Sequence, residues 1–244
     1  GLVGSEMCIS VSPPGKLISF FLTVVIAAFL VFQPDFGQAC LILFGWSVVY
    51  FVAGAQILLL IGVAAATIGL GSFAYTYSEH FARRIDGFLS PDLDPKTQLG
   101  YATNAIQEGG FFGVGVGEGQ VKWSLPDAHT DFIIAVAAEE YGFVLVGLIL
   151  AIYAAIVSIS LARLLRERDI FVRLAGTGLV CMFGIQAVIN IGVAARLLPA
   201  KGMTLPFVSY GGSSLIAGGI AIGILLALTR SRPQKNVADI FIKG

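Results

Sequence analysis

The chain has 244 residues, a formal net charge of +0, 57% hydrophobic residues and only 12% charged residues, with a mean hydropathy of +0.88. A soluble domain carries about 25% charged residues, so this composition excludes a water-soluble globular protein and predicts an integral membrane protein. The lack of a basic excess excludes a nucleic-acid partner, because nothing is available to neutralise phosphates. Three scattered cysteines match neither a metal site nor a disulfide framework: Cys8, Cys40 and Cys181.

The first residues of the chain fit no targeting or membrane segment. Residues 1–15 have neither the pattern of a signal peptide nor that of a span, and the sequence does not begin with Met. We interpret residues 1–15 as a leader of doubtful nativeness, residues 16–233 as a membrane domain and residues 234–244 as a cytoplasmic tail.

Long apolar stretches with few charges dominate the membrane domain. A hydrocarbon core about 30 Å thick takes roughly 20 helical residues. The stretches predict six transmembrane helices, near 17–32, 37–53, 57–76, 132–157, 174–194 and 211–229. The expected fold class is therefore all-α, a polytopic membrane helix bundle, with a polar loop at residues 77–131 between the third and fourth spans.

The lysines and arginines predict which side of the membrane each connection faces. Six spans place both ends of the chain on one side, and basic residues favour the cytoplasm. Nine of the 15 basic residues fall on the side of the termini, and six fall on the other. The loop 77–131, the turn 33–35 and the stretch 196–210 are therefore predicted to face outward.

The outward loop contains a short amphipathic segment and a run of glycines. Residues 97–108 predict a helix that lies in the membrane interface, with an apolar face of Leu99, Ala102, Ala105 and Ile106. Six glycines follow between residues 109 and 119, but their spacing does not match the dinucleotide fingerprint and no strand precedes them. A flexible or close-packed turn is the favoured interpretation.

Asp131 stands where the outward loop enters the fourth span. One interpretation is structural, because Thr130 or Asp131 is suited to cap the free N–H groups of the helix that follows. The other is functional, because desolvation at a membrane boundary raises the pKa of a carboxyl group toward that of a useful general base. His129 lies beside it, but two ligands without a third make a weak metal site.

Two further segments place polar chemistry near the same side. Glu139 and Glu140 follow within the fourth span, where acidic groups either pack in neutralised form or line a polar cavity. The stretch from Arg196 to Ser214 contains two prolines and paired glycines, so a plain helix is excluded. Non-helical backbone inside a membrane is tolerated only against protein or a water-filled cavity.

The outward basic residues suit an anionic, lipid-linked ligand. Cationic side chains bind phosphate or pyrophosphate, and a nearby carboxylate is able to activate a hydroxyl group. The candidates for this binding role are Arg83, Arg84, Arg196 and Lys201. Spacing alone does not separate an enzyme from a transporter whose acidic residues carry protons.

Four motifs in this order resemble the SEDS family (shape, elongation, division and sporulation). They read QPDFGQ at 33–38, PDAHTDFI at 126–133, AEEYG at 138–142 and LPAKGMTLPFVSYGGSS at 198–214. The last motif is most similar to the cell-division, or FtsW, branch rather than to the RodA elongation branch. The resemblance runs from about Lys16 to Pro233.

The resemblance implies a ten-helix bacterial inner-membrane enzyme, of which this chain matches the carboxyl-terminal part. Such an enzyme polymerises lipid II into peptidoglycan glycan strands on the outer face of the membrane and releases undecaprenyl pyrophosphate. The implied partners are a class B penicillin-binding protein, other division proteins and membrane lipids. No cofactor is required by the sequence, although a divalent cation is compatible with the leaving group.

The resemblance also assigns roles to motif residues. Asp131, in the His-Thr-Asp motif, is the expected catalytic base. The expected substrate-binding residues are the motif residues His129 and Ser209, together with four cations chosen by charge and predicted side alone: Arg83, Arg84, Arg196 and Lys201. The expected site-shaping residues are Asp35, Glu139, Glu140, Gly211 and Gly212, and no metal ligand is expected.

One departure from the family pattern bears on activity. The Ser-Glu and Lys motif that normally precedes the first matching span is not reproduced between Ser12 and Leu17, and the family has about four more helices. We therefore expect this chain alone to lack polymerase activity. Two other functions fit the sequence: a lipid II flippase, and a non-enzymatic division scaffold that recruits a transpeptidase.

Overall fold

The computed structural model describes residues 13–33, 35–54, 56–90, 97–199 and 202–230. Every regular element within these ranges is helical. The helices are α1 (Pro13–Phe32), α2 (Phe36–Val52), α3 (Ile57–Tyr77), α4 (Glu79–Leu89), α5 (Gln98–Gly109), η1 (Val121–Trp123), α6 (Ile133–Leu164), α7 (Ile170–Ala194) and α8 (Gly212–Thr229). The all-α prediction is confirmed.

The six predicted apolar helices correspond to α1, α2, α3, α6, α7 and α8. Four of them, α3, α6, α7 and α8, have the length and apolar composition needed to cross a membrane, and Leu17–Phe32 and Phe36–Val52 form shorter apolar helices. The helix α1 begins at Pro13, where proline is favoured because a first-turn N–H has no helical partner. The remaining leader residues 1–12 and the predicted tail 234–244 lie outside the described residues.

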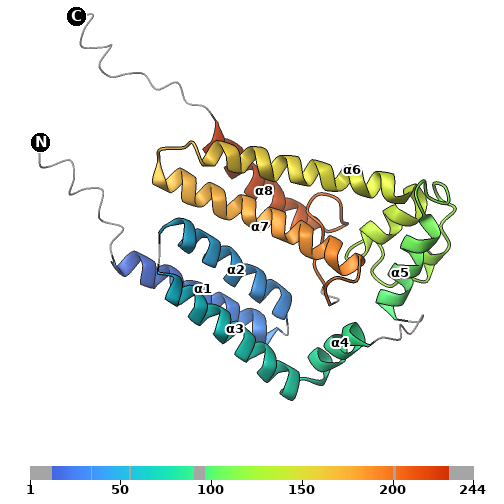
Figure 1. Cartoon of the computed structure of the whole chain (residues 1–244), viewed down its shortest axis with the longest axis horizontal. Coiled ribbons are helices and arrows are strands. Elements are labelled where there is room, and N and C mark those ends of the chain that lie inside the picture. The colour runs from blue at the N-terminus through green and yellow to red at the C-terminus, as the bar shows by residue number, and fades with distance from the viewer. Residues whose placement is uncertain (1–12, 34, 55, 91–96, 200–201, 231–244) are drawn as a thin grey trace, which may run out of the picture.

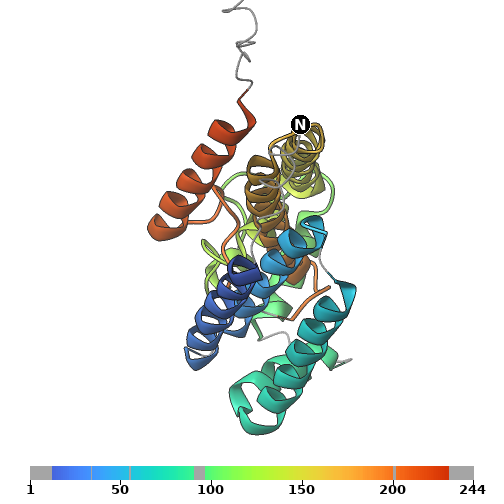
Figure 2. The ribbon, with the colours of Figure 1, turned by 90° about the vertical axis from the view of Figure 1, so that its left-hand side faces the viewer.

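The long helices run back and forth between two ends of the molecule. The α2–α3 and α6–α7 turns lie at one end, while the α1–α2 turn, α4 and α5 lie at the opposite end (Figure 1). The helix α7 is central, since it packs against α2, α5, α6 and α8. Figure 2 shows α8 and α3 on opposite flanks of the bundle.

The helix α6 is broken at Gly142. This residue has φ 73° and ψ −173°, far from helical values, and glycine adopts such angles without the steric penalty of a Cβ atom. The glycine-rich loop occupies the break: Val114 N–H donates to Glu139 C=O at 2.9 Å, and Phe143 N–H donates to Gly110 C=O at 3.0 Å. The loop thus supplies hydrogen-bond partners that the interrupted helix would otherwise lack.

Two glycines of this loop, Gly109 and Gly113, are packed closely against the backbone of α6. A Cβ atom on Gly113 would lie 2.1 Å from Glu140 O, and one on Gly109 would lie 1.9 Å from Ala138 O. Both distances are far shorter than any real contact. The close-packed form of the predicted turn is therefore the one that the structure adopts.

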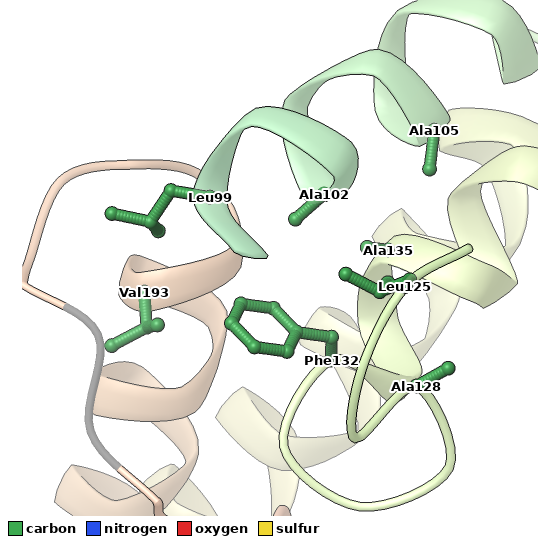
Figure 3. Close-up of a cluster of buried hydrophobic side chains, with 8 residues drawn as sticks. All are labelled: Leu99, Ala102, Ala105, Leu125, Ala128, Phe132, Ala135 and Val193. Atoms are coloured by element: carbon green, nitrogen blue, oxygen red, sulfur yellow. The ribbon is translucent and has the colours of Figure 1, made fainter. Parts of the chain in front are cut away.

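The amphipathic helix is present as α5, and its apolar face meets protein rather than lipid. Thr97 caps it by accepting a hydrogen bond from Gly100 N–H at 3.1 Å. Its apolar face packs inside the protein, in a core formed by Leu99, Ala102, Ala105, Leu125, Ala128, Phe132, Ala135 and Val193 (Figure 3). An apolar stripe looks the same in sequence whether it meets lipid or protein, so periodicity alone does not identify the neighbour.

Candidate functional site at the outer end of the bundle

Asp131 lies in a tight turn that leads into α6. The carbonyl of Asp127 accepts hydrogen bonds from the N–H groups of Thr130, Asp131 and Phe132, at 3.1, 3.1 and 3.3 Å. Asp127 itself has φ 56°, an uncommon value for a residue other than glycine. The cap position of α6 is Phe132, and no side chain makes a capping hydrogen bond there. Phe132, rather than Thr130 or Asp131, is thus the N-cap residue of α6.

Three consecutive carbonyl groups around Asp131 are held by other parts of the chain. The carbonyl of His129 accepts from Tyr210 N–H at 2.9 Å, and that of Thr130 accepts from the Ser209 hydroxyl. The carbonyl of Asp131 accepts from Asn190 Nδ2 at 2.9 Å. Because α7 and the 202–211 segment both contribute, the tripeptide His129–Asp131 is fixed from two directions.

Asn190 joins the two motifs that carry the polar residues. Its Nδ2 atom also donates to Met203 O at 2.6 Å, and the residue is only 1% exposed. Both donors of one buried amide group therefore hold backbone of the candidate site. The Oδ1 atom of the same side chain is buried without a hydrogen-bond partner in the described structure.

The carboxylate of Asp131 lies against the backbone of Gly202. A Cβ atom on Gly202 would be 3.4 Å from Asp131 Oδ2, so a larger side chain would begin to crowd the carboxylate. The same segment is fixed by Ser209, whose Oγ accepts from Leu205 N–H at 2.8 Å, and by Tyr153, whose hydroxyl donates to Pro206 O. Ser209 is thus engaged within the protein.

Two cavities open beside this turn and share His129 and Tyr210 in their walls. One, of about 630 Å³, is also lined by Ser209 and by the glycines that begin α8, Gly211 and Gly212. The other, of about 520 Å³, includes Thr130, which adjoins Asp131 in the chain. Both volumes fall within the range of about 300 to 1,000 Å³ typical of ligand pockets.

Two of the four predicted basic residues, Arg83 and Arg196, lie outside the lining of these two cavities. Arg83 is exposed on α4, and its Nη2 pairs with Glu79 Oε2 at 3.0 Å. Arg196 donates from Nη2 to Ser90 O at 2.7 Å and lines a different cavity, between α5, α6 and α7. The side chain of Arg84 and the whole of Lys201 lie outside the described residues.

The predicted site-shaping residues have clear structural roles. Asp35 caps α2 by accepting from Gln38 N–H at 3.1 Å. Glu139 is fully buried, and its carboxylate accepts from Val121 N–H at 2.8 Å and from Lys122 N–H at 3.0 Å. Glu140 forms an ion pair with Lys122. The sequence left two alternatives for these acids, packing within the protein or lining a polar cavity. Glu139 is packed within the protein, whereas Glu140 also lines a cavity.

Three residues of the site were not predicted: Asn190, Tyr210 and Lys122. Each is set in place by contacts between segments far apart in the chain, and such contacts leave no mark on local sequence patterns. Tyr210 belongs to the motif at 198–214, and this membership is the sequence feature that points to it. No group of three or more metal-ligating His, Cys, Asp or Glu residues occurs in the described part of the chain.

Comparison with known proteins supplies the family. The model of the FtsW/RodA/SpoVE family, described as cell cycle protein, matches residues 7–234. This chain belongs to the FtsW/RodA/SpoVE family. It is 43% identical to a probable peptidoglycan glycosyltransferase FtsW from Caulobacter vibrioides, over 90% of this chain and 56% of that protein.

Solved structures of FtsW/RodA/SpoVE relatives share the fold. A chain of a peptidoglycan synthase complex that coordinates polymerization and crosslinking matches with a TM-score of 0.72 and 34% identity, over 88% of this chain and 61% of that one. RodA from Thermus thermophilus matches with a TM-score of 0.61 and 28% identity, over 92% and 59%. The chain thus spans about three fifths of the length of these relatives, and it is a multi-pass membrane protein of their family.

Proposed function

We propose that the protein is a peptidoglycan glycosyltransferase of the cell-division branch, which polymerises lipid II on the outer face of the bacterial inner membrane. The observation that supports this most directly is the fixed backbone of His129–Asp131. A catalytic base must be held within hydrogen-bond reach of its proton, and three tertiary hydrogen bonds fix this tripeptide.

In the proposed reaction, Asp131 is the general base. Its carboxylate accepts the proton of the 4-hydroxyl of an N-acetylglucosamine in lipid II. The hydroxyl oxygen forms a bond to the anomeric carbon of the growing strand, and the bond from that carbon to undecaprenyl pyrophosphate breaks. A positioned base supplies about 10²- to 10⁴-fold, so orientation and stabilisation of the departing pyrophosphate must supply most of the acceleration.

The contacts of the other predicted residues limit the roles that we propose for them. His129 borders both cavities, so it remains the proposed substrate contact nearest to Asp131. Ser209 and Glu139 act through backbone that they hold. Lys201 and Arg84 remain the proposed cations for the pyrophosphate, whereas the ion pair of Arg83 and the hydrogen bond of Arg196 direct these two elsewhere.

A transpeptidase is the proposed partner. The structural relative that matches best among those above comes from a synthase complex with both polymerising and crosslinking activity. By analogy, we propose that this protein works with a class B penicillin-binding protein, together with other division proteins.

The test is a gel assay of glycan strands made from labelled lipid II, in membranes that contain a full-length version of the protein and its transpeptidase partner. Asp131→Ala is expected to abolish strand formation, while protein level and partner binding persist. Strand formation by Asp131→Ala at the parental rate would exclude Asp131 as the base. Loss of lipid translocation in the same variant would favour the flippase, and loss of partner recruitment would favour the scaffold.

A further inference from the structure

The cavity of about 520 Å³ beside the His129–Asp131 turn has aromatic and polar residues in its wall that have no role in the proposed reaction so far. Its wall combines two large aromatic side chains, Trp123 and Tyr210, with polar groups from Lys122, Asp127, His129 and Glu140. Trp123 is 80% exposed and Tyr210 is 79% exposed. Aromatic rings held at the surface beside polar groups are typical of sites that recognise a ligand with both apolar and polar faces.

The charges in this wall argue against an anionic ligand. The ammonium group of Lys122 is already paired with Glu140, and both side chains are largely buried, at 13% and 14% exposed. Asp127 adds a further negative charge, so the titratable wall residues carry a net charge of about −1 when His129 is neutral. A pyrophosphate or another phosphate would therefore meet net repulsion here rather than attraction.

Trp123 is held in place by its neighbours. Val121 and Lys122, the two residues before it in η1, donate their backbone N–H groups to the buried carboxylate of Glu139. Lys122 Nζ also lies 5.3 Å from the centroid of the Trp123 ring, a cation–π distance. The ring therefore projects from an anchored backbone, and it is suited to act as a rigid platform.

We propose that this cavity is a saccharide subsite that binds an uncharged N-acetylated sugar of the glycan. Trp123 stacks on the apolar face of the pyranose ring, and the carboxylates of Asp127 and Glu140 accept hydrogen bonds from its hydroxyl groups. This inference rests on the proposed function, because it assigns one end of that substrate to one side of His129. The neighbouring cavity, whose described lining has no acidic side chain, is left for the pyrophosphate end.

Intrinsic fluorescence gives a test that needs no turnover. The chain has two tryptophans, and the other, Trp46, stacks on Tyr50 within α2. In a Trp46→Phe variant of the full chain, Trp123 is the sole reporter. Titration with the uncharged β-1,4-linked tetramer of N-acetylglucosamine is expected to change its emission saturably, whereas maltotetraose and inorganic pyrophosphate at equal ionic strength leave it unchanged.

A second measurement covers the case in which Trp46→Phe folds poorly. The parental protein, with both tryptophans, is compared with Trp123→Phe, and only the parental emission should respond to the tetramer. No response of Trp123 to the tetramer, or a stronger response to pyrophosphate, overturns the proposal. Because this readout is binding alone, it is independent of whether Asp131 proves to be the base.

The kinetic counterpart uses the lipid II assay. Trp123→Ala is expected to raise the KM for lipid II about 10-fold through loss of stacking, with kcat little changed. Trp123→Phe, which keeps an aromatic ring, should recover most of this loss. The matched control is Phe112→Ala, which removes another exposed ring, 84% exposed, outside the cavity. An equal effect of Phe112→Ala and Trp123→Ala would contradict the subsite.

Discussion

Asn190 connects α7 to the backbone of Asp131. One amide nitrogen donates to Asp131 O and Met203 O, so it fixes the entry to α6 and the segment beside Gly202 at once. A buried carbonyl that loses its donor costs about 1–3 kcal/mol. The position of the proposed base thus depends on a side chain 59 residues away in the chain.

Asn190→Ala is therefore expected to lower both stability and strand formation. The cost should be about 1–3 kcal/mol for each carbonyl left without a donor, measured as a lower thermal midpoint in detergent, with at least a 10-fold slower polymerisation. The matched control is Gln186→Ala, one turn earlier on α7, because Gln186 bonds Thr204 O at 3.3 Å but not Asp131. Equal rates for the two variants would contradict a positioning role.

Glu139 is a second residue that holds the backbone of the site, because its carboxylate accepts the N–H groups of Val121 and Lys122. Glu139→Gln keeps one acceptor oxygen and loses the other, so either Val121 N–H or Lys122 N–H is left without its partner. A hydrogen bond to a charged group contributes about 1.5–3 kcal/mol. We expect faster hydrogen exchange at the amides of Val121 and Lys122, measured by mass spectrometry.

The control for Glu139 is its neighbour in the chain. Glu140→Gln weakens the ion pair with Lys122 but leaves the two backbone bonds to Glu139 in place. Exchange at the same amides should change much less in this variant. Similar exchange in both variants would show that the carboxylate of Glu139 does not anchor η1.

At the scale of elements, the break in α6 and the glycine-rich loop are one unit. The loop donates and accepts hydrogen bonds at the broken turn, and a Cβ atom on Gly142 would lie 2.3 Å from Phe111 O. Each part thus supplies hydrogen-bond partners to the other. The loop also leads directly to η1 and to the turn that carries Asp131, so a disturbance at the break should reach the site.

Gly142→Ala is expected to destabilise the protein by about 3 kcal/mol or more, because it adds backbone strain to a steric clash. The same substitution at Gly147, farther along α6, meets no atom within 4 Å. Gly147→Ala should be neutral or stabilising by about 0.5–1 kcal/mol. The measurement is the thermal unfolding midpoint of the two variants in the same detergent. Equal midpoints would contradict the claim that α6 is broken at Gly142 because that position requires glycine.

At the scale of the whole molecule, the two ends differ in charge. The α6–α7 turn carries Arg166 and Arg168, with Arg163 and Arg173 close by in the flanking helices, and Figure 1 places this turn opposite α4 and α5. Basic residues favour the cytoplasmic side. The apolar windows of α3 and α8, of which only 6% is buried, leave large apolar faces on both flanks for lipid or for other helices.

This arrangement predicts the topology in cells. In a version whose native cysteines are replaced by serine, Ser124→Cys in the outer segment is expected to react with a membrane-impermeant maleimide in intact spheroplasts. Leu165→Cys, which is exposed at the α6–α7 turn, should react only after permeabilisation. Labelling of Leu165→Cys in intact spheroplasts would reverse the assigned orientation and place Asp131 inside the cell.

The sequence by itself determined the class of protein, the apolar helices and the family. Because hydropathy is a local property, the helices of the six apolar stretches begin within four residues of the predicted bounds. The motifs that carry the resemblance are likewise read directly from residue order. The roles of Asp131, His129 and the cations stay predictions, because a motif states which residues occur together and not what each one contacts.

Only the tertiary structure decided where the polar groups point. The apolar face of α5 met protein instead of lipid, Arg83 and Arg196 turned to partners outside the two cavities, and α6 broke at Gly142. The Arg83–Glu79 pair is local, four residues apart within α4, whereas the contacts of α5, Arg196 and Gly142 join segments far apart in the chain. Such contacts depend on the packing of several helices at once, and no local pattern of residues encodes them.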